Sequence, residues 1–143
     1  MQYSGKAQIL KQSPIFSSLN DDELAELANL SIERSFRTNE FIFWDGDAPE
    51  WFYIIAEGKV KVLKHSSSGR EFVIAFFNSG EMFGEVAVFE GESYPASAQA
   101  IAETKVVGIR REDFLSFLAH HPALAHRIIN ILGGATQGCP ESP

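Results

Sequence analysis

Residues 80–91 read Gly-Glu-Met-Phe-Gly-Glu-Val-Ala-Val-Phe-Glu-Gly, and residues 92–98 continue Glu-Ser-Tyr-Pro-Ala-Ser-Ala. Three glycines punctuate the first of these segments, and glycine permits positive φ angles and close backbone approaches. Gly84-Glu85, followed by small apolar residues, predicts a tight turn with exposed backbone N–H groups rather than an ordinary helix or strand. Such a turn can hold an anion or a polar ligand. The alternative is a plain loop between strands with a solvated Glu85.

The chain on both sides of this stretch predicts short strands. Apolar runs and alternating patterns are separated by turn-forming residues, as at Asp45–Pro49 and Ser66–Gly69. In the clearest alternation Val60 and Val62 are expected to point inward and the neighbouring lysines outward. Many short strands with regular turn signals indicate an all-β sandwich or barrel. The expected strands are 32–38, 40–44, 51–55, 59–64, 71–77, 96–101 and 105–109.

Helices are expected to bracket the strands. Asn20 and Glu23 form a capping-box pattern that predicts a helix over Asp21–Leu30. His121-Pro122 predicts the start of the last helix, because proline fits the first helical position. The other expected helices cover residues 4–12 and 111–119, the latter with Phe114, Leu115 and Leu118 on its buried face.

The last helix is expected to span Pro122–Leu132 and to stop at Gly133-Gly134. It is apolar on more than one face, which favours at least two packing partners. Residues 133–143 are polar and rich in Gly and Pro, and this composition predicts a disordered tail. The sequence therefore predicts one domain over residues 1–132, followed by that tail.

Composition narrows the class of protein. The 143 residues carry a formal net charge of −7, which opposes direct binding to a nucleic-acid backbone. The single cysteine, Cys139, cannot form an internal disulfide or an iron–sulfur site. No apolar run approaches the length needed to span a membrane. These features predict a soluble, cytoplasmic protein that does not act at a membrane.

The order and spacing of several motifs resemble the cyclic-nucleotide-binding domain of the Crp/Fnr type, over roughly Ile9–Leu132. This resemblance implies a mainly β fold with flanking helices: a double-stranded β-roll (jelly roll) with short N-terminal helices and a C-terminal helix. The motifs that carry it are Pro14-Ile15-Phe16 with Leu24, Phe41-Ile42-Phe43 with Gly46-Asp47, Tyr53–Gly58 followed by Val60-Lys61-Val62, and Gly80 with Phe83–Ala87.

The resemblance also implies a ligand site. In family members that bind cyclic nucleotides, the residue matched by Glu85 bonds the ribose, and an Arg followed by Ser or Thr neutralises the cyclic phosphate. Those two positions fall on Tyr94 and Pro95 here. The implied ligand-binding residues are Phe83, Gly84, Glu85, Val86, Ala87, Tyr94, Pro95 and Ala96.

The loss of the phosphate ligands predicts weak or no cAMP binding. Burying a phosphate charge without a partner costs several kcal/mol. Residues 72–104 contain no Lys or Arg, and only Lys64 and Arg70 lie nearby along the chain.

The implied function is non-enzymatic: the effector-sensing domain of a Crp/Fnr-type transcription regulator that responds to another signal, such as redox state, oxygen, nitric oxide or a small metabolite. A cyclic nucleotide or another small-molecule effector is the only ligand expected. The helix over Pro122–Leu132 is expected to carry the signal and to form a homodimer. No DNA-binding domain follows it, so direct DNA binding by this chain is not expected.

Alternatives remain open at this point. The chain could be a genuine cAMP or cGMP domain with a non-standard phosphate contact, or a stand-alone dimerisation domain. A cupin-like metalloenzyme is disfavoured because no His-x-His occurs. Haem ligation is disfavoured because each histidine has a simpler role in a loop, at a cap or beside the last helix. These candidates are His65, His120, His121 and His126.

Overall fold

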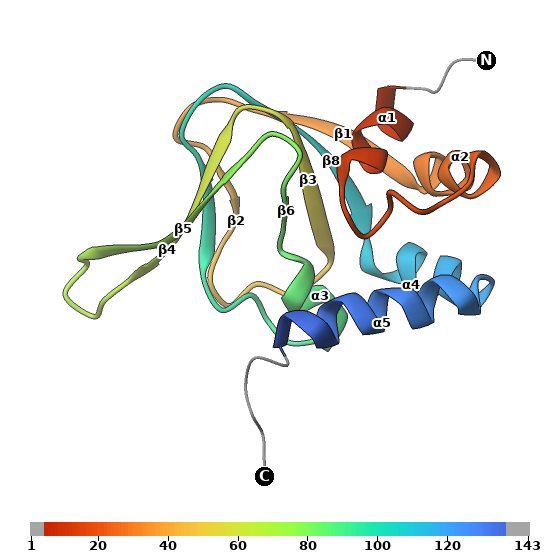
Figure 1. Cartoon of the computed structure of the whole chain (residues 1–143). Helices are drawn as coiled ribbons and strands as arrows, with labels where there is room; N and C mark the ends of the chain where they lie inside the picture. Colours follow the sequence, from red (N-terminus) through yellow and green to blue (C-terminus); the bar gives the residue numbers. More distant parts are fainter. Residues whose placement is uncertain (1–4, 137–143) are drawn as a thin grey trace, which may run out of the picture.

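Two four-stranded antiparallel sheets form the body of the protein, as the computed structural model shows for residues 5–136 (Figure 1). The first sheet has the order β1-β8-β3-β6 and the second β2-β7-β4-β5. The strands are β1 (Ser31–Phe36), β2 (Phe41–Phe43), β3 (Trp51–Glu57), β4 (Lys59–His65), β5 (Glu71–Asn78), β6 (Met82–Phe83), β7 (Ser97–Ala100) and β8 (Thr104–Arg110). The helices are α1 (Gly5–Gln12), α2 (Asp21–Leu30), α3 (Glu85–Glu90), α4 (Arg111–Ala119) and α5 (Pro122–Thr136).

Strand β3 is buried on both faces, and this separates the interior into two cores. Phe52 and Ile54 pack with the helices, whereas Tyr53 and Ile55 pack between the two sheets. Successive side chains of a strand point to opposite faces. A strand covered on both sides therefore reads as a continuous apolar run, as residues 51–55 do.

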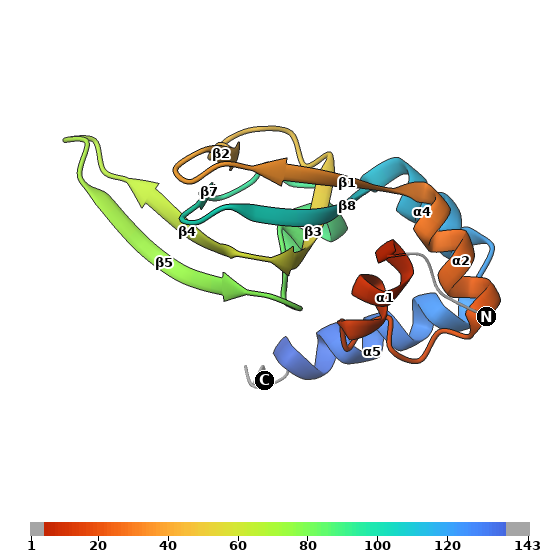
Figure 2. The ribbon, with the colours of Figure 1, turned by 90° about the horizontal axis from the view of Figure 1, so that it is seen from above.

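The helices gather on one side of the sheets, and the β4–β5 hairpin projects on the other (Figures 1 and 2). The predicted capping box of α2 is confirmed: the Asn20 side chain accepts from the backbone N–H of Glu23 at 2.8 Å, and the Glu23 carboxylate accepts from that of Asn20 at 3.0 Å. Acidic residues in the first turn also suit the positive end of the helix. The expected fold class, a β-roll with flanking helices, is thus the observed architecture.

The β4–β5 hairpin is only partly buried. Val60 points inward as predicted, and Lys61 pairs with Glu71 at 2.5 Å between Nζ and Oε2. The simple alternation fails beyond Val62, because the register shifts there and Leu63 is also fully buried. Strand β5 lies at the edge of its sheet and exposes large apolar side chains: Phe72, Val73, Ile74 and Phe76.

The predicted buried face of α4 is partly wrong. Phe114 and Phe117 are fully buried, whereas Leu115 is 41% exposed. Residues three apart share a helix face, but adjacent residues are separated by about 100°. Phe117, three residues after Phe114, therefore shares its buried face.

The predicted end of the last helix is also wrong, because α5 continues through Gly133-Gly134 to Thr136. Glycine costs a helix about 1 kcal/mol relative to alanine but can still adopt helical angles. The rest of the predicted disordered tail, residues 137–143, lies outside the described residues. Among the helices that are described, none is long and apolar enough to cross a membrane.

Candidate functional site

Residues 82–91 form a strand, a turn and a short helix, which corrects the expectation of a turn alone. Gly84 follows β6 with a φ of 84° and is the N-cap of α3, which begins at Glu85. A Cβ at Gly84 would lie 3.2 Å from the Phe43 ring. Any residue other than glycine would also be strained at this positive φ. Glycine is therefore required where this stretch turns against β2.

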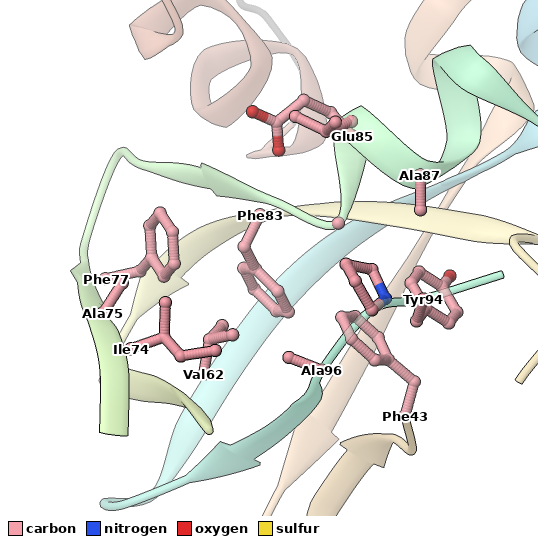
Figure 3. A pocket seen from close by; sticks show the side chains of 13 residues that line it. Phe43, Val62, Ile74, Ala75, Phe77, Phe83, Glu85, Ala87, Tyr94 and Ala96 are labelled. Carbon is pink, nitrogen blue, oxygen red and sulfur yellow. The ribbon is translucent and has the colours of Figure 1, made fainter. Parts of the chain in front are cut away.

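All eight predicted site residues line one cavity of about 200 Å³ (Figure 3). Residues Phe83–Ala87, here called the cassette, come from β6 and the start of α3, and Tyr94, Pro95 and Ala96 come from the segment before β7. The structure thus brings together two segments that the resemblance paired. The binding role of these residues stays a prediction.

Five further lining residues were missed by the sequence analysis. They come from β2 and from the β4–β5 hairpin, which are remote in sequence from the cassette. The alternation of β4 placed Val62 on the inner face, but nothing in the sequence showed that this face borders the cassette. The missed residues are Phe43, Val62, Ile74, Ala75 and Phe77.

Tyr94 is fixed in the cavity wall rather than free to contact a ligand. Its ring stacks on that of Phe43 with centroids 3.7 Å apart and planes 5° apart. Its hydroxyl accepts from the backbone N–H of Trp51 at 3.1 Å and donates to the Trp51 carbonyl. Burial raises the pKa of Tyr94 to about 12. The phenol is therefore a neutral structural group at neutral pH.

Replacing Tyr94 by phenylalanine is expected to lower the free energy of unfolding by about 1–3 kcal/mol, because both backbone groups of Trp51 lose a partner in a partly buried place. Urea denaturation measures this loss. Tyr53→Phe is the matched control: it removes only a bond from the exposed Arg34 and should cost clearly less. Equal losses in the two variants would contradict this role of Tyr94.

Glu85 lies above the aromatic rings, with its carboxylate turned away from them (Figure 3). Burial raises the pKa of Glu85, an effect that is partly opposed by a hydrogen bond from its own backbone N–H. The described residues provide no other hydrogen bond or ion pair to this carboxylate. Glu85 is thus neither the fully solvated residue of the simple loop alternative nor a satisfied core residue.

No Lys or Arg is among the residues that line the described cavity. Lys64 and Arg70, the two nearby cations along the chain, are exposed and do not reach it. The walls are aliphatic and aromatic, with Glu85 as their only ionisable carboxyl group. This arrangement suits an apolar ligand and offers no cationic side chain to an anion.

The described part of the chain contains no group of three or more His, Cys, Asp or Glu side chains that could hold a metal ion. His121, at the α4–α5 junction, lies between Glu26 and Glu23, with nitrogen–oxygen distances of 3.0 and 3.6 Å. Its ring also packs on Phe117. Sequence reasoning expected only a cap at this position and missed the contact with α2.

Trp44, Trp51 and Tyr53, three aromatic residues near the ends of β2 and β3, differ in their surroundings. Tyr53 is buried between the sheets, Trp51 is half-buried, and Trp44 is exposed and stacks on Phe41. None of these three lines the cavity beside Glu85. Tyr53 and Trp51 instead line a second pocket, which shares Phe43 and Tyr94 with the first.

The cyclic nucleotide-binding domain family matches residues 33–121 of this chain. The chain belongs to that family. The cyclic AMP receptor protein of Thermus thermophilus is 30% identical over 123 residues, which are 86% of this chain and 57% of the receptor. This cyclic nucleotide-binding domain thus spans a little over half the length of the first curated relatives it matches.

Solved structures agree with this assignment. The N-terminal domain of a Streptomyces coelicolor transcriptional regulator has a TM-score of 0.81 and 27% identity, covering 91% of both chains. The regulatory subunit of a cAMP-independent protein kinase A from Trypanosoma brucei has a TM-score of 0.76 and 26% identity, covering 91% of this chain and 45% of that one. These relatives are regulatory proteins, and the chain shares their fold over the parts that the comparison covers.

Proposed function

We propose that this chain is the effector-sensing domain of a Crp/Fnr-type transcription regulator whose effector is not a cyclic nucleotide. The observation that carries the proposal is the cavity wall at Tyr94, where a neutral ring bonded to the Trp51 backbone stands in the place expected for the phosphate-binding arginine. No cation lines the cavity to take over that role.

The electrostatics of the cavity supports the exclusion of cyclic nucleotides as effectors. A cyclic phosphate would enter an apolar cavity whose only ionisable carboxyl group is that of Glu85. Desolvating an anion there without a cationic partner costs several kcal/mol, and nearby negative charge adds repulsion. Each 1.4 kcal/mol lowers an affinity tenfold. This cost is enough to remove binding at physiological concentrations.

A relative offers a parallel. The Trypanosoma brucei subunit is described as cAMP-independent, and a triple variant of it, in which one substitution introduces an arginine, is described as bound to cAMP. This parallel supports the expectation that a domain with this fold can lack cAMP binding.

Helix α3 supplies a route by which occupancy of the cavity could reach the C-terminal helix. Ala87 faces the cavity, and the next residue, Val88, belongs to the core that also holds Phe114 of α4. Arg111 begins α4, and its Nε donates to the Val88 carbonyl at 2.8 Å. A ligand that displaces α3 would thus act on α4 and, through it, on α5. Demonstrating this coupling requires two observed states.

Calorimetric titration with cAMP and cGMP tests the proposal. We expect no binding at micromolar to submillimolar nucleotide, with the domain shown to be folded by its thermal transition. Micromolar affinity for either nucleotide would instead support the second candidate, a cyclic-nucleotide domain with a non-standard phosphate contact. The cAMP named in relatives such as the Thermus thermophilus receptor favours that candidate.

The proposed homodimer through residues 122–132 rests on α5. Leu124 and Ile128 are buried against the domain, whereas Ile129 is 65% exposed and would be available to a second copy. The division of the chain into one domain and a C-terminal tail likewise remains a prediction, although α5 continues past the predicted boundary at residue 132 to Thr136.

A further inference from the structure

The cavity beside Glu85 has an open mouth bordered by apolar side chains. Ile74 of β5 and Val86 of α3 both line the cavity, and they are 57% and 56% exposed. Inside, Phe83, Phe77 and Phe43 present ring surfaces (Figure 3). Cavities of this kind bind apolar molecules and use a few polar groups to fix their orientation.

One polar group is suitably placed for that purpose. The Glu85 carboxylate is partly shielded from water at the rim above the rings, and it has no partner among the described residues beyond its own backbone N–H. A half-buried carboxylate without a partner is stabilised by any cation or hydrogen-bond donor that reaches it. A ligand whose apolar part fills the cavity would place its head group at this rim.

The local charge favours a cationic head group over an anionic one. Residues 72–104 contain five glutamates and no Lys or Arg. The carboxylates nearest to Glu85 in the chain are Glu81 and Glu90, both exposed. A cation entering the mouth would therefore be attracted, and an anion repelled.

We propose that the effector of this domain is an apolar, ring-containing amine, with its ring in the cavity and its ammonium group beside Glu85. This inference rests on the proposed function and adds to it the chemical class of the effector. The ammonium would donate to this carboxylate, whose only partner among the described residues is its own backbone N–H. The ring would pack against the phenylalanines that line the cavity.

Three probes of matched shape test the inference: naphthylmethylamine, naphthylmethanol and naphthoate, titrated separately by calorimetry into the folded domain at neutral pH. We expect the amine to bind about tenfold more tightly than the alcohol, as a charge-assisted hydrogen bond would give, and the carboxylate to bind least. Equal affinity for amine and carboxylate would overturn the proposal, and so would no binding of any probe.

Two variants assign the preference to Glu85. Glu85→Gln should reduce amine binding to the level of the alcohol and leave alcohol binding unchanged. Glu90→Gln is the control, because it removes the same charge from an exposed position of the same helix outside the cavity lining. An amine preference that survives in Glu85→Gln, or that is lost equally in Glu90→Gln, would contradict the proposal.

The cyclic-nucleotide titration keeps this result separate from that of the proposed function. If cAMP or cGMP binds, the proposed function fails whatever the naphthalene probes do. If neither nucleotide binds and the amine shows no preference, only the assignment of the effector class fails.

Discussion

Replacing Tyr94 by arginine together with Pro95 by serine is expected to raise the affinity for cAMP by at least about a hundredfold, from no detectable binding to the micromolar range. The two changes supply the cation and the hydroxyl that the resemblance places at these positions. A buried phosphate–guanidinium contact offsets several kcal/mol of the free-energy cost of desolvating the cyclic phosphate. Each 1.4 kcal/mol changes the affinity tenfold. Calorimetry with cAMP measures the gain.

The substitution also removes a structural group, so the comparison needs a matched control. Tyr94→Gln with Pro95→Ser loses the same stack on Phe43 and the same bonds to Trp51 but adds no charge. Both variants should be destabilised, and only the arginine variant should bind cAMP. A folded arginine variant that fails to bind would show that position 94 does not face the phosphate site.

Phe114→Ala is expected to cost about 3–5 kcal/mol of stability, the range for truncating a large buried aromatic residue. Phe114 is fully buried in the core that joins the helices to the first sheet. Its ring lies within 5.1–6.4 Å, centroid to centroid, of four other phenylalanine rings: Phe16, Phe52, Phe89 and Phe117. Such a loss is a large part of a typical domain's total stability of about 5–15 kcal/mol.

Urea denaturation of Phe114→Ala and Leu115→Ala provides the test. Leu115 is the adjacent residue on α4 but is 41% exposed, so its truncation should cost well under half as much. Equal losses would mean that the face of α4 observed here is not the one that carries the packing energy.

The β-roll could be predicted from the sequence because its signals are local. The capping box at Asn20 and Glu23, the apolar run of β3 and the turn residues between strands each act within a few positions, and each was borne out. The errors arose where local signals compete. Gly133-Gly134 weakens a helix without ending it. The buried face of α4 was predicted to include Leu115, which is adjacent to Phe114, whereas the buried residue is Phe117, about one turn further along the helix.

Only those residues of the candidate site that a pattern in the sequence links could be predicted. The cassette and residues 94–96 were found because a family pattern links them, and the structure places them around one cavity. Phe43 and the residues of the β4–β5 hairpin could not be found, since their approach to the cassette depends on the pairing of β7 with β2 and β4 and of β4 with β5. The stacking of Tyr94 on Phe43 likewise joins segments that no local pattern connects.

Strand β5 has a consequence for the behaviour of the protein in solution. An edge strand with exposed phenylalanine, valine and isoleucine side chains can template the addition of another strand, the first step of fibrillar aggregation. The formal net charge of −7 opposes this by keeping molecules apart. Salt screens that repulsion and leaves the apolar edge unchanged. The rate at which a concentrated sample aggregates should therefore increase with ionic strength.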